Sequence, residues 1–432
     1  MISVLWEPWY LGFRVVLSFK IMKKIYLDYA ASTPVRGEVL KAMLPYFSEK
    51  YGNPGSLHSF GQEAMGAVDG AREALARSLG AEFREIVFTG SATEANNLVL
   101  RGAVGAARLD KFLKPKVIVS AIEHESVLDT AHELERDGVE VVVLPVDRKG
   151  IVDLKKLEEE LDERTILVSV MYVNNEIGTI EPIKKISDIV KGFRERKASP
   201  NALAKAKTWA SPRRQPEQEY SANYPLLHTD AAQAFMYLDC DVGKLGVDLM
   251  TLSGQKVYGP KGIGALYVNS KLEIRNFKFL SPQVTGGGQE FNLRSGTENV
   301  SSIAGFGCAA ELAAVSRRRN AKYVEGAKDY FWKKLKAVYK RAEINGSVGA
   351  PHIVNVYFPS EYTGDFLVRL DQVGIAASAG SACSARSFTP SHVLGALGFP
   401  EERVRGSVRF SFGLTTTRKE IDETIRRIKN LL

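Results

Sequence analysis

Residues 247–268 read VDLMTLSGQKVYGPKGIGALYV, and this stretch decides the fold class. VDLMTL and IGALYV are apolar runs of the length of a buried strand, and the polar segment between them is rich in glycine and carries Lys256. We therefore expect a strand, a tight turn and a second strand. Lys256 follows the first strand directly, where a side chain can point inward while the backbone bends.

Upstream of this stretch, short apolar runs alternate with amphipathic stretches of helical period. Such alternation is typical of a mainly parallel sheet covered by helices, so the expected fold class is α/β. Helices are expected at ATEANNLVLRGAV, ESVLDTAHELERDG and KKISDIVKGFRERK. The strands are expected at REIVFTG (84–90), KVIVSAI (116–122), VEVVVLP (139–145), ERTILVSVMYV (163–173) and PLLHTDAAQ (225–233).

Downstream, GGGQEFNLRSGTEN at 286–299 breaks this rhythm and precedes an expected helix over 300–319. The later runs HIVNVYF, GIAASAG and SVRFSFG predict strands of a smaller α/β unit that closes over the first. Residues 198–224 are rich in Ala, Ser, Pro and charge without a sustained apolar period, which indicates a loop or insertion. The expected division is an N-terminal extension (1–24), a large domain with this insertion (25–285) and a small domain (286–432).

The composition is that of an ordinary globular enzyme. The 432 residues allow two or three structural units, and 45% hydrophobic with 25% charged residues argue against fibrous, disordered and membrane classes. The formal charge of +8 is spread along the chain, so no direct nucleic-acid binding is expected. Cys240, Cys308 and Cys383 are too few for a disulfide framework and form no CxxC pair. A reducing, cytoplasmic compartment and no resident metal site are expected.

Residues 2–19, ISVLWEPWYLGFRVVLSF, form the one segment that suggests targeting. Glu7, Pro8 and Arg14 interrupt it, and it lacks a basic start and a small-residue cleavage site, so neither a signal peptide nor a membrane span is expected. An anchor lying in a membrane interface stays open as an alternative. The favoured interpretation is an extension without a catalytic role, or translation that begins at Met22.

Lys256 and Asp230 form the first chemical pair. A lysine amine becomes a catalyst when a carbonyl cofactor is held beside it. Asp230 ends the apolar run LLHT at the predicted sheet edge where ligands of α/β proteins bind, and a carboxylate there can keep a pyridinium nitrogen protonated. Taken singly, Lys256 would be a solvated surface charge and Asp230 a helix N-cap. Together they predict a cofactor site.

A phosphate site is predicted at TGSATEANN, residues 89–97. This turn leads into a helix, where free backbone amides and the helix dipole favour an anion. Thr93 adds a hydroxyl near the helix start, and Ser253 and Gln255 are further donors beside the lysine turn. The alternative is ordinary helix capping, which uses the same residue types.

Three further residues complete the predicted site. His124, in AIEHES at another strand end, can stack on an aromatic cofactor and move protons near neutral pH, or serve a structural role. Cys383 lies among small and polar residues that suggest an accessible loop, while Cys308 in an apolar helix and Cys240 are expected to be buried or structural. Arg409 alternates with apolar residues on a predicted strand, so it is either exposed or a bidentate clamp for a substrate carboxylate.

The order and spacing of these segments resemble the cysteine desulfurase family of the NifS/IscS type, which is class V aminotransferase-like and belongs to the fold-type-I pyridoxal-phosphate enzymes. The resemblance runs from about residue 25 to the C-terminus, with 198–224 as the main gap. Each motif alone is weak, and their combination is highly specific. They are YLDYAASTP, YGNPGSLHSFG, VFTGSATEANN, EHESVLD, VNNEIGTIEPI, TDAAQ, SGQKVYGPKGIGALYV, GGGQEFNLRSGT and SAGSACSARSFTPSHVLGALG.

The resemblance implies removal of sulfur from L-cysteine with pyridoxal 5'-phosphate, giving L-alanine and a persulfide on Cys383. It also implies a role for each site residue. Lys256 binds the cofactor and moves the substrate α-proton, and His124 stacks on the ring and handles the thiol proton. Around the ring, Asp230 pairs with the nitrogen, while Asn175 and Gln233 approach the oxygen and Arg409 with Asn175 grips the substrate carboxylate. The phosphate is reached by Thr297 from the second subunit of a homodimer and is held from its own chain by Ala92, Thr93, Ser253 and Gln255.

The resemblance also implies sulfur-accepting partners. The loop with SFTPSHVL resembles the group whose mobile loop delivers sulfur to other proteins, so an iron–sulfur scaffold protein or a tRNA-thiolation acceptor is expected. Transient ligation of an iron–sulfur cluster by Cys383 is the one metal contact considered. The sequence departs from the family at Gln255, where His is usual, and at Gly90-Ser91, where Ser-Gly is usual. An amide still donates to phosphate but carries no charge, which predicts weaker affinity with the chemistry retained.

Three alternatives stay open at this point. One is a selenocysteine lyase, and another is an aminotransferase of the same fold type. Cys383 argues against the aminotransferase because transamination needs no such thiol. The third is a non-catalytic sulfur-relay or scaffold-binding protein, against which the joint presence of Lys256, Asp230, His124 and Cys383 argues.

Overall fold

The computed structural model describes residues 23–109, 114–197, 224–270, 279–347, 349–380 and 390–432. At its centre lies a seven-stranded sheet in the order β2-β8-β7-β6-β5-β3-β4. Neighbouring strands from β7 to β4 pair in parallel, which confirms the mainly parallel sheet and the α/β class. The strands are β2 (Ile86–Thr89), β3 (Lys116–Ser120), β4 (Glu140–Leu144), β5 (Thr165–Ser169), β6 (Leu226–Asp230), β7 (Leu249–Ser253) and β8 (Gly264–Val268).

The expected strand, turn and strand at 247–268 form a hairpin of β7 and β8. Because the ten residues between the two strands are too few for a crossover helix, β8 returns antiparallel to β7. It also pairs antiparallel with β2 on its other side. The turn that carries Lys256 therefore reverses the chain direction, and β8 is the one strand of the described sheet that runs antiparallel to the others.

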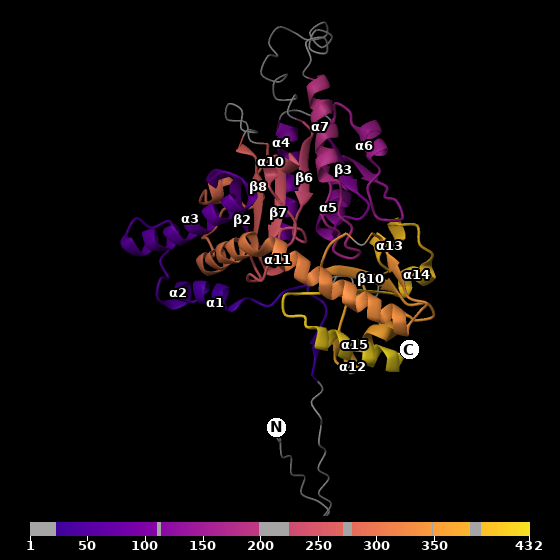
Figure 1. Cartoon of the computed structure of the whole chain (residues 1–432). Coiled ribbons are helices and arrows are strands. Elements are labelled where there is room, and N and C mark those ends of the chain that lie inside the picture. The colour runs from indigo at the N-terminus through magenta and orange to yellow at the C-terminus, as the bar shows by residue number, and fades with distance from the viewer. Residues whose placement is uncertain (1–22, 110–113, 198–223, 271–278, 348, 381–389) are drawn as a thin grey trace, which may run out of the picture.

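Both faces of the sheet are covered by helices, as Figure 1 shows. On β3, Val117 and Val119 pack in the core formed with α4 and α5, while Ile118 packs in the core of the opposite face. Burial on both faces explains why the strands read as continuous apolar runs. The helices of this part are α1 (Gly37–Met43), α2 (Pro45–Ser48), α3 (Ser59–Leu79), α4 (Ala92–Leu109), α5 (Glu125–Arg136), α6 (Leu154–Glu160), α7 (Ile183–Lys197) and α10 (Val242–Leu245).

A second group of elements gathers around a three-stranded antiparallel sheet of order β12-β10-β9 and a parallel pair, β1 with β11. Through that pair, the start of the described chain joins the C-terminal elements; the division at 285/286 stays a prediction. The elements are β1 (Ile25–Tyr26), α11 (Val300–Val338), β9 (Glu343–Asn345), β10 (Ile353–Tyr357), α12 (Thr363–Gln372), β11 (Ile375–Ala376), α13 (His392–Ala396), α14 (Glu401–Arg405), β12 (Ser407–Ser411) and α15 (Arg418–Leu431).

Helix α11 is about twice as long as the helix expected over 300–319. Its buried stripe continues through Val324, Ala327, Phe331 and Leu335, at the three- and four-residue spacing of a helix face. Phe331 packs against Phe410 with ring centroids 4.8 Å apart. Figure 1 shows α11 running from α3 to the C-terminal elements beside α15. The helix therefore continues because its second half packs on the smaller sheet.

Some sequence predictions fall outside the described residues. These are the extension up to residue 22, nearly all of the insertion (198–223), and Cys383. Among the helices that the structure describes, none combines the length and the apolar character needed to cross a membrane.

Candidate active site

The candidate site lies at the edge of the sheet where the parallel strands end. Asp230 is the last residue of β6 and Ser253 the last of β7, so both lie at the edge where ligands of α/β proteins bind. The Asp230 side chain is buried, and its residue is 7% exposed. Its Oδ1 accepts the backbone N–H of Ala232 at 2.9 Å, and its Oδ2 accepts Asn96 Nδ2 at 2.8 Å. Two donors thus hold the carboxylate in one orientation.

Lys256 ends the short helix η2 (Gly254–Lys256), which follows β7 directly. Its Nζ donates to the carbonyl oxygens of Ala30 and Ala31 at 2.6 and 2.7 Å. The side-chain amide of Gln233 donates to the same Ala30 oxygen at 2.9 Å. The lysine amine and Gln233, predicted from separate segments, therefore meet at the loop after β1.

Gln233 is fixed from its other end by His352, a residue that the sequence analysis missed. The pKa of His352 is lowered to about 3 by burial, so the imidazole is neutral at physiological pH. Its Nε2 donates to Gln233 Oε1 at 3.0 Å, and its ring stacks on Tyr237 with centroids 4.4 Å apart. The Gln233 amide group is thus aimed at Ala30.

The N-terminus of α4 packs tightly against β8. A Cβ on Gly264 would lie 2.5 Å from the carbonyl carbon of Ser91, so only glycine permits this approach. Ser91 Oγ accepts the backbone N–H of Glu94 at 3.1 Å and caps the first turn. The Glu94 carboxylate accepts the Gly90 N–H at 2.9 Å and Arg294 Nε at 2.8 Å. The Glu94 carboxylate therefore lies at the turn that was predicted to bind phosphate. A negative group in this position agrees with the preference of a helix N-terminus for anions.

His124 begins a hydrogen-bond chain that reaches Asp230. It caps α5, and its Nδ1 lies 3.1 Å from the backbone N–H of Ser126, which donates to it, and 2.9 Å from Ser126 Oγ. Asn96 Nδ2 donates both to Ser126 Oγ and to Asp230 Oδ2 at 2.8 Å. Since Nδ1 is an acceptor, the neutral ring carries its proton on Nε2. The orientations of His124 and Asp230 are coupled through Asn96 and Ser126.

Arg409 contacts Asn175, through the Asn175 backbone, and their predicted role in holding a substrate carboxylate stays a prediction. Arg409 is 1% exposed, and its Nη1 donates to the Asn175 carbonyl oxygen at 2.8 Å. Its Nη2 donates to Asp28 Oδ1 at 2.8 Å, and its buried Nε has no partner among the described residues. The charge is therefore not exposed to solvent. The ion pair with Asp28, in the motif YLDYAASTP, was not predicted.

The other predicted contacts differ in exposure. Of these residues, Ser253 alone is buried. Ala92 at the start of α4, His124 and Gln255 are half-buried. Thr93 in α4 and Thr297 before α11 are exposed. The exposure of Thr297 leaves it free to face a second chain, and its role stays a prediction.

Two of the three cysteines lie in the described part of the chain. Cys240 is buried, as expected, and burial raises its pKa to about 12. Cys308 is half-buried rather than buried, because its neighbours Ala309 and Ala310 occupy the buried stripe of α11. Its pKa is also raised, mainly by desolvation. Neither thiol has the low pKa of a reactive cysteine.

Glu123 supports the segment that carries His124. Its Oε1 accepts Ser120 Oγ at 2.5 Å and the Met171 N–H at 2.8 Å, and its buried Oε2 has no hydrogen-bond partner among the residues that the structure describes. Burial raises the pKa of Glu123 from 4.5 to about 8. The folded state therefore binds the proton more tightly than the unfolded state. Stability from this group is full below pH 4.5 and is lost as the pH rises through 8.

We predict that Glu123→Gln is more stable than the original chain at high pH, because an amide avoids the buried charge and keeps the oxygen acceptor. The gain in the free energy of unfolding should be on the order of 2 kcal/mol at about pH 9 and smaller at about pH 5. Urea unfolding at both pH values measures it, with Glu135→Gln on the exposed side of α5 as the control. An equal gain at both pH values would contradict the prediction.

These side chains fit pyridoxal phosphate, the cofactor that the sequence implies. An aldehyde needs an amine, which Lys256 supplies, and a pyridine nitrogen needs an oriented carboxylate, which Asp230 supplies. A phosphate needs amides and hydroxyls at a helix start. The turn that precedes Ala92 supplies the amides, and Ser253 supplies a hydroxyl. The donor set comes from the ends of β6 and β7 and the start of α4, three adjoining parts of the sheet edge.

Known proteins are similar to this chain over nearly its whole length. The family model for aminotransferase class-V matches residues 25–196 and 218–424. "Cysteine desulfurase IscS" of Dictyoglomus turgidum is 40% identical over 413 residues, covering 95% of both chains. "Putative cysteine desulfurase IscS 1" of Bacillus subtilis is 40% identical, covering 95% of this chain and 99% of the relative.

Solved structures are similar over the same length. A "NIFS-LIKE PROTEIN" matches with a TM-score of 0.80 and 33% identity, covering 95% of this chain and 99% of its own. "SspA in complex with cysteine" matches with a TM-score of 0.72 and 36% identity, covering 91% and 100%. The fold-type-I architecture is therefore confirmed, and the chain belongs to the aminotransferase class-V family.

Proposed function

We propose that the protein is a pyridoxal-phosphate-dependent cysteine desulfurase that converts L-cysteine to L-alanine and leaves the sulfur as a persulfide on Cys383. The observation that carries the proposal is the junction of Lys256 and Gln233 at Ala30, together with an Asp230 carboxylate that Asn96 and Ser126 link to His124. An amine, an oriented carboxylate and an imidazole are what this chemistry requires. The names of the relatives and the cysteine complex of a similar structure support the same substrate.

In this proposal, each residue has one task at a stated atom. When bound, pyridoxal phosphate supplies an electron sink for charge that develops at the substrate Cα. Asp230 holds the ring nitrogen proton, and Lys256 Nζ takes up the α-proton after leaving the carbonyls of Ala30 and Ala31. His124 Nε2 exchanges the proton of the substrate thiol, while its Nδ1 stays bonded to Ser126.

The substrate carboxylate is assigned to Arg409 and Asn175. Because Arg409 is paired with Asp28, the incoming carboxylate has to compete with Asp28 or use the unpartnered Nε. The sulfur then moves in one displacement. The Cys383 thiolate attacks the substrate sulfur, an S–S bond forms, and the C–S bond breaks with its electron pair left on carbon. Protonation of that carbon, together with return of the α-proton from Lys256 Nζ to Cα, yields L-alanine.

The assembly and the sulfur acceptor complete the proposal. We propose a cytoplasmic homodimer in which Thr297 of one chain contacts the phosphate in the other, and Ala92, Thr93, Ser253 and Gln255 hold it from their own chain. An iron–sulfur scaffold protein or a tRNA-thiolation acceptor would receive the sulfur. The IscS names of the relatives support the first of these acceptors.

The direct test is turnover by the purified protein. A cysteine desulfurase should be yellow and should release equal amounts of alanine and, with a reductant, sulfide from L-cysteine. L-Selenocysteine is assayed in parallel, because a selenocysteine lyase would act on it and not on L-cysteine. Colourless protein that takes up no pyridoxal phosphate, or yellow protein that releases no alanine, would overturn the proposal.

Gln255→His should tighten retention of the cofactor. Gln255 is half-buried in η2, where its backbone oxygen is fixed by Thr33 Oγ1 at 2.8 Å, so the substitution alters the side chain without freeing the loop. An imidazolium makes a charge-assisted bond to phosphate, with a gain of about 1 kcal/mol, or roughly fivefold in affinity. Loss of yellow colour on dialysis measures it. Gln255→Leu is the control that should lose cofactor faster, and equal retention in all three proteins would exclude a phosphate contact here.

A further inference from the structure

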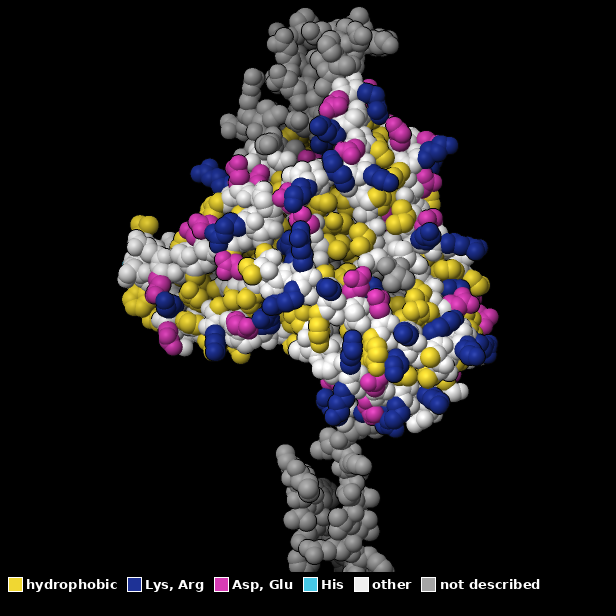
Figure 2. Space-filling model, viewed as in Figure 1, with side chains coloured by type: hydrophobic (Ala, Val, Ile, Leu, Met, Phe, Trp, Pro, Cys, Tyr) yellow, Lys and Arg dark blue, Asp and Glu magenta, His cyan; other side chains and the backbone are white. Residues whose placement is uncertain are grey.

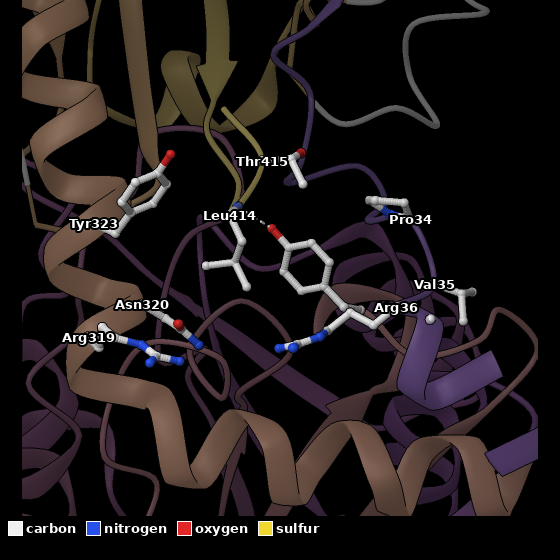
Figure 3. Close-up of a pocket in the computed structure, with 10 residues that line it drawn as sticks. Pro34, Val35, Arg36, Arg319, Asn320, Tyr323, Leu414 and Thr415 are labelled. Atoms are coloured by element: carbon white, nitrogen blue, oxygen red, sulfur yellow. Dashed lines mark hydrogen bonds between the residues drawn. The ribbon is translucent and has the colours of Figure 1, made fainter. Parts of the chain in front are cut away.

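A cavity lies beside Tyr258, two residues along the chain from Lys256. Its volume is about 520 Å³, within the range of small-molecule sites. Figure 3 shows Arg36 reaching into it from the start of α1, while Arg319 and Asn320 face it from α11. Tyr258, Tyr323 and Leu414 form other parts of the wall. None of the residues placed so far in cofactor or substrate contact lines this cavity.

The cavity is positively charged. Arg36 and Arg319 line it, and its described lining contains no Asp or Glu. Arg36 forms an ion pair with Glu38, to which its Nε and Nη2 donate at 3.4 and 2.8 Å. Arg319 forms no ion pair with any described residue and donates only to Ser316 Oγ at 3.1 Å. Figure 2 shows Lys and Arg side chains gathered over the middle of α11, which contains the run SRRRNAK. An anion would therefore be attracted to this side of the molecule.

Asn320 gives the second observation. It is 5% exposed, and its Nδ2 is buried without a hydrogen-bond partner in the described structure. Such an amide loses its water and gains no acceptor in return, which is energetically unfavourable. Since Asn320 lines the cavity between two guanidinium groups, an acceptor oxygen placed there would satisfy it.

We propose that this cavity binds a phosphate monoester. A phosphate carries a charge of about −1.5 to −2 at neutral pH and three acceptor oxygens, which match two guanidinium groups and one amide donor. The apolar walls of Val35, Leu414 and the Tyr258 ring suit an organic part rather than a free ion. A monocarboxylate carries a single negative charge and would neutralise only one of the two arginines.

The bound monoester would act on the lysine turn through Tyr258. This residue has φ of 63°, the left-handed region that non-glycine residues rarely adopt, and its contacts hold it there. Its Oη accepts the Leu414 N–H at 2.6 Å, its carbonyl oxygen accepts the Arg36 N–H at 3.1 Å, and its N–H donates to Thr33 Oγ1 at 2.8 Å. Movement of Arg36 or Leu414 toward a ligand therefore changes the support of Lys256.

The test uses the full-length protein loaded with pyridoxal phosphate, so that the cofactor site does not take up the probe. Phenyl phosphate is titrated by calorimetry at constant ionic strength, with benzoate as the monocarboxylate. Saturable binding of phenyl phosphate is expected, and Arg319→Gln should weaken it about tenfold. Arg318→Gln is the matched control, since Arg318 is an exposed neighbour that does not line the cavity. Equal weakening by both variants, equal affinity for benzoate, or no saturable binding would overturn the proposal.

The effect on Lys256 rests on the proposed function and is measured separately. Saturating phenyl phosphate should change the rate of alanine release at least about twofold in the original protein and leave Arg319→Gln unchanged at the same concentration. An unchanged rate in a protein that binds the probe and turns over cysteine would overturn the coupling. Because binding is read by calorimetry, a protein without desulfurase activity still tests the cavity.

Discussion

Lys256→Ala should remove the yellow colour and lower cysteine turnover by roughly 100- to 10,000-fold or more, the range lost when a group that moves a proton is removed. No other described lysine is held between the Ala30 and Ala31 carbonyls beside Gln233. Its Nζ is the amine at the edge where Asp230 ends β6. Absorbance of the purified variant and alanine release measure the two effects. Far-ultraviolet circular dichroism confirms that the fold is retained.

Lys261→Ala is the matched control for this experiment. Lys261 belongs to the same hairpin turn but is exposed, so its ammonium group interacts mainly with water. We expect its colour and turnover to stay within about twofold of the original protein, as for a surface substitution. If Lys261→Ala were the more damaging change, the assignment of Lys256 would be wrong.

Local sequence patterns were sufficient for the parts of the site that follow directly from strands. Asp230, Ser253 and Lys256 stand at or just after the ends of apolar runs, and the structure has strands β6 and β7 in those places. Parallel strands bring such positions to one edge without further information. The turn at Gly90 was predicted for the same reason, because it joins β2 to α4.

Contacts between remote segments were not accessible in this way. Asn96 is 134 residues from Asp230, and Asp28 is 381 residues from Arg409. A signal for Asn96 exists in hindsight: it is polar and fully buried on a helix whose neighbours Ala95 and Val99 are apolar core residues. Buried polar groups need partners, so such a position marks a contact without naming the partner. The second half of α11 was missed although its buried apolar residues have the spacing of a helix face; what the sequence could not show is the remote residue on which Phe331 packs, Phe410.

Cys383→Ser should separate the two halves of the proposed reaction. The variant should stay yellow and still change its absorbance when L-cysteine is added, because Lys256, Asp230 and the turn at Gly90 are untouched. It should form no persulfide, and sulfide release should fall to background. A hydroxyl is almost fully protonated near neutral pH and is a far poorer nucleophile toward sulfur than a thiolate. Mass spectrometry of the protein after addition of L-cysteine detects the persulfide directly.

The other two cysteines give this experiment its controls. Cys240 is buried and its pKa is raised to about 12, so it holds almost no thiolate at neutral pH, and Cys308 also has a raised pKa. Cys240→Ala and Cys308→Ala should therefore retain desulfuration, apart from a loss of stability of about 1 kcal/mol from packing. If Cys383→Ser still released sulfide and Cys308→Ala did not, the half-buried thiol on α11 would be the acceptor. If the original protein and all three variants released selenide from L-selenocysteine, and none released sulfide from L-cysteine, the enzyme would be a selenocysteine lyase.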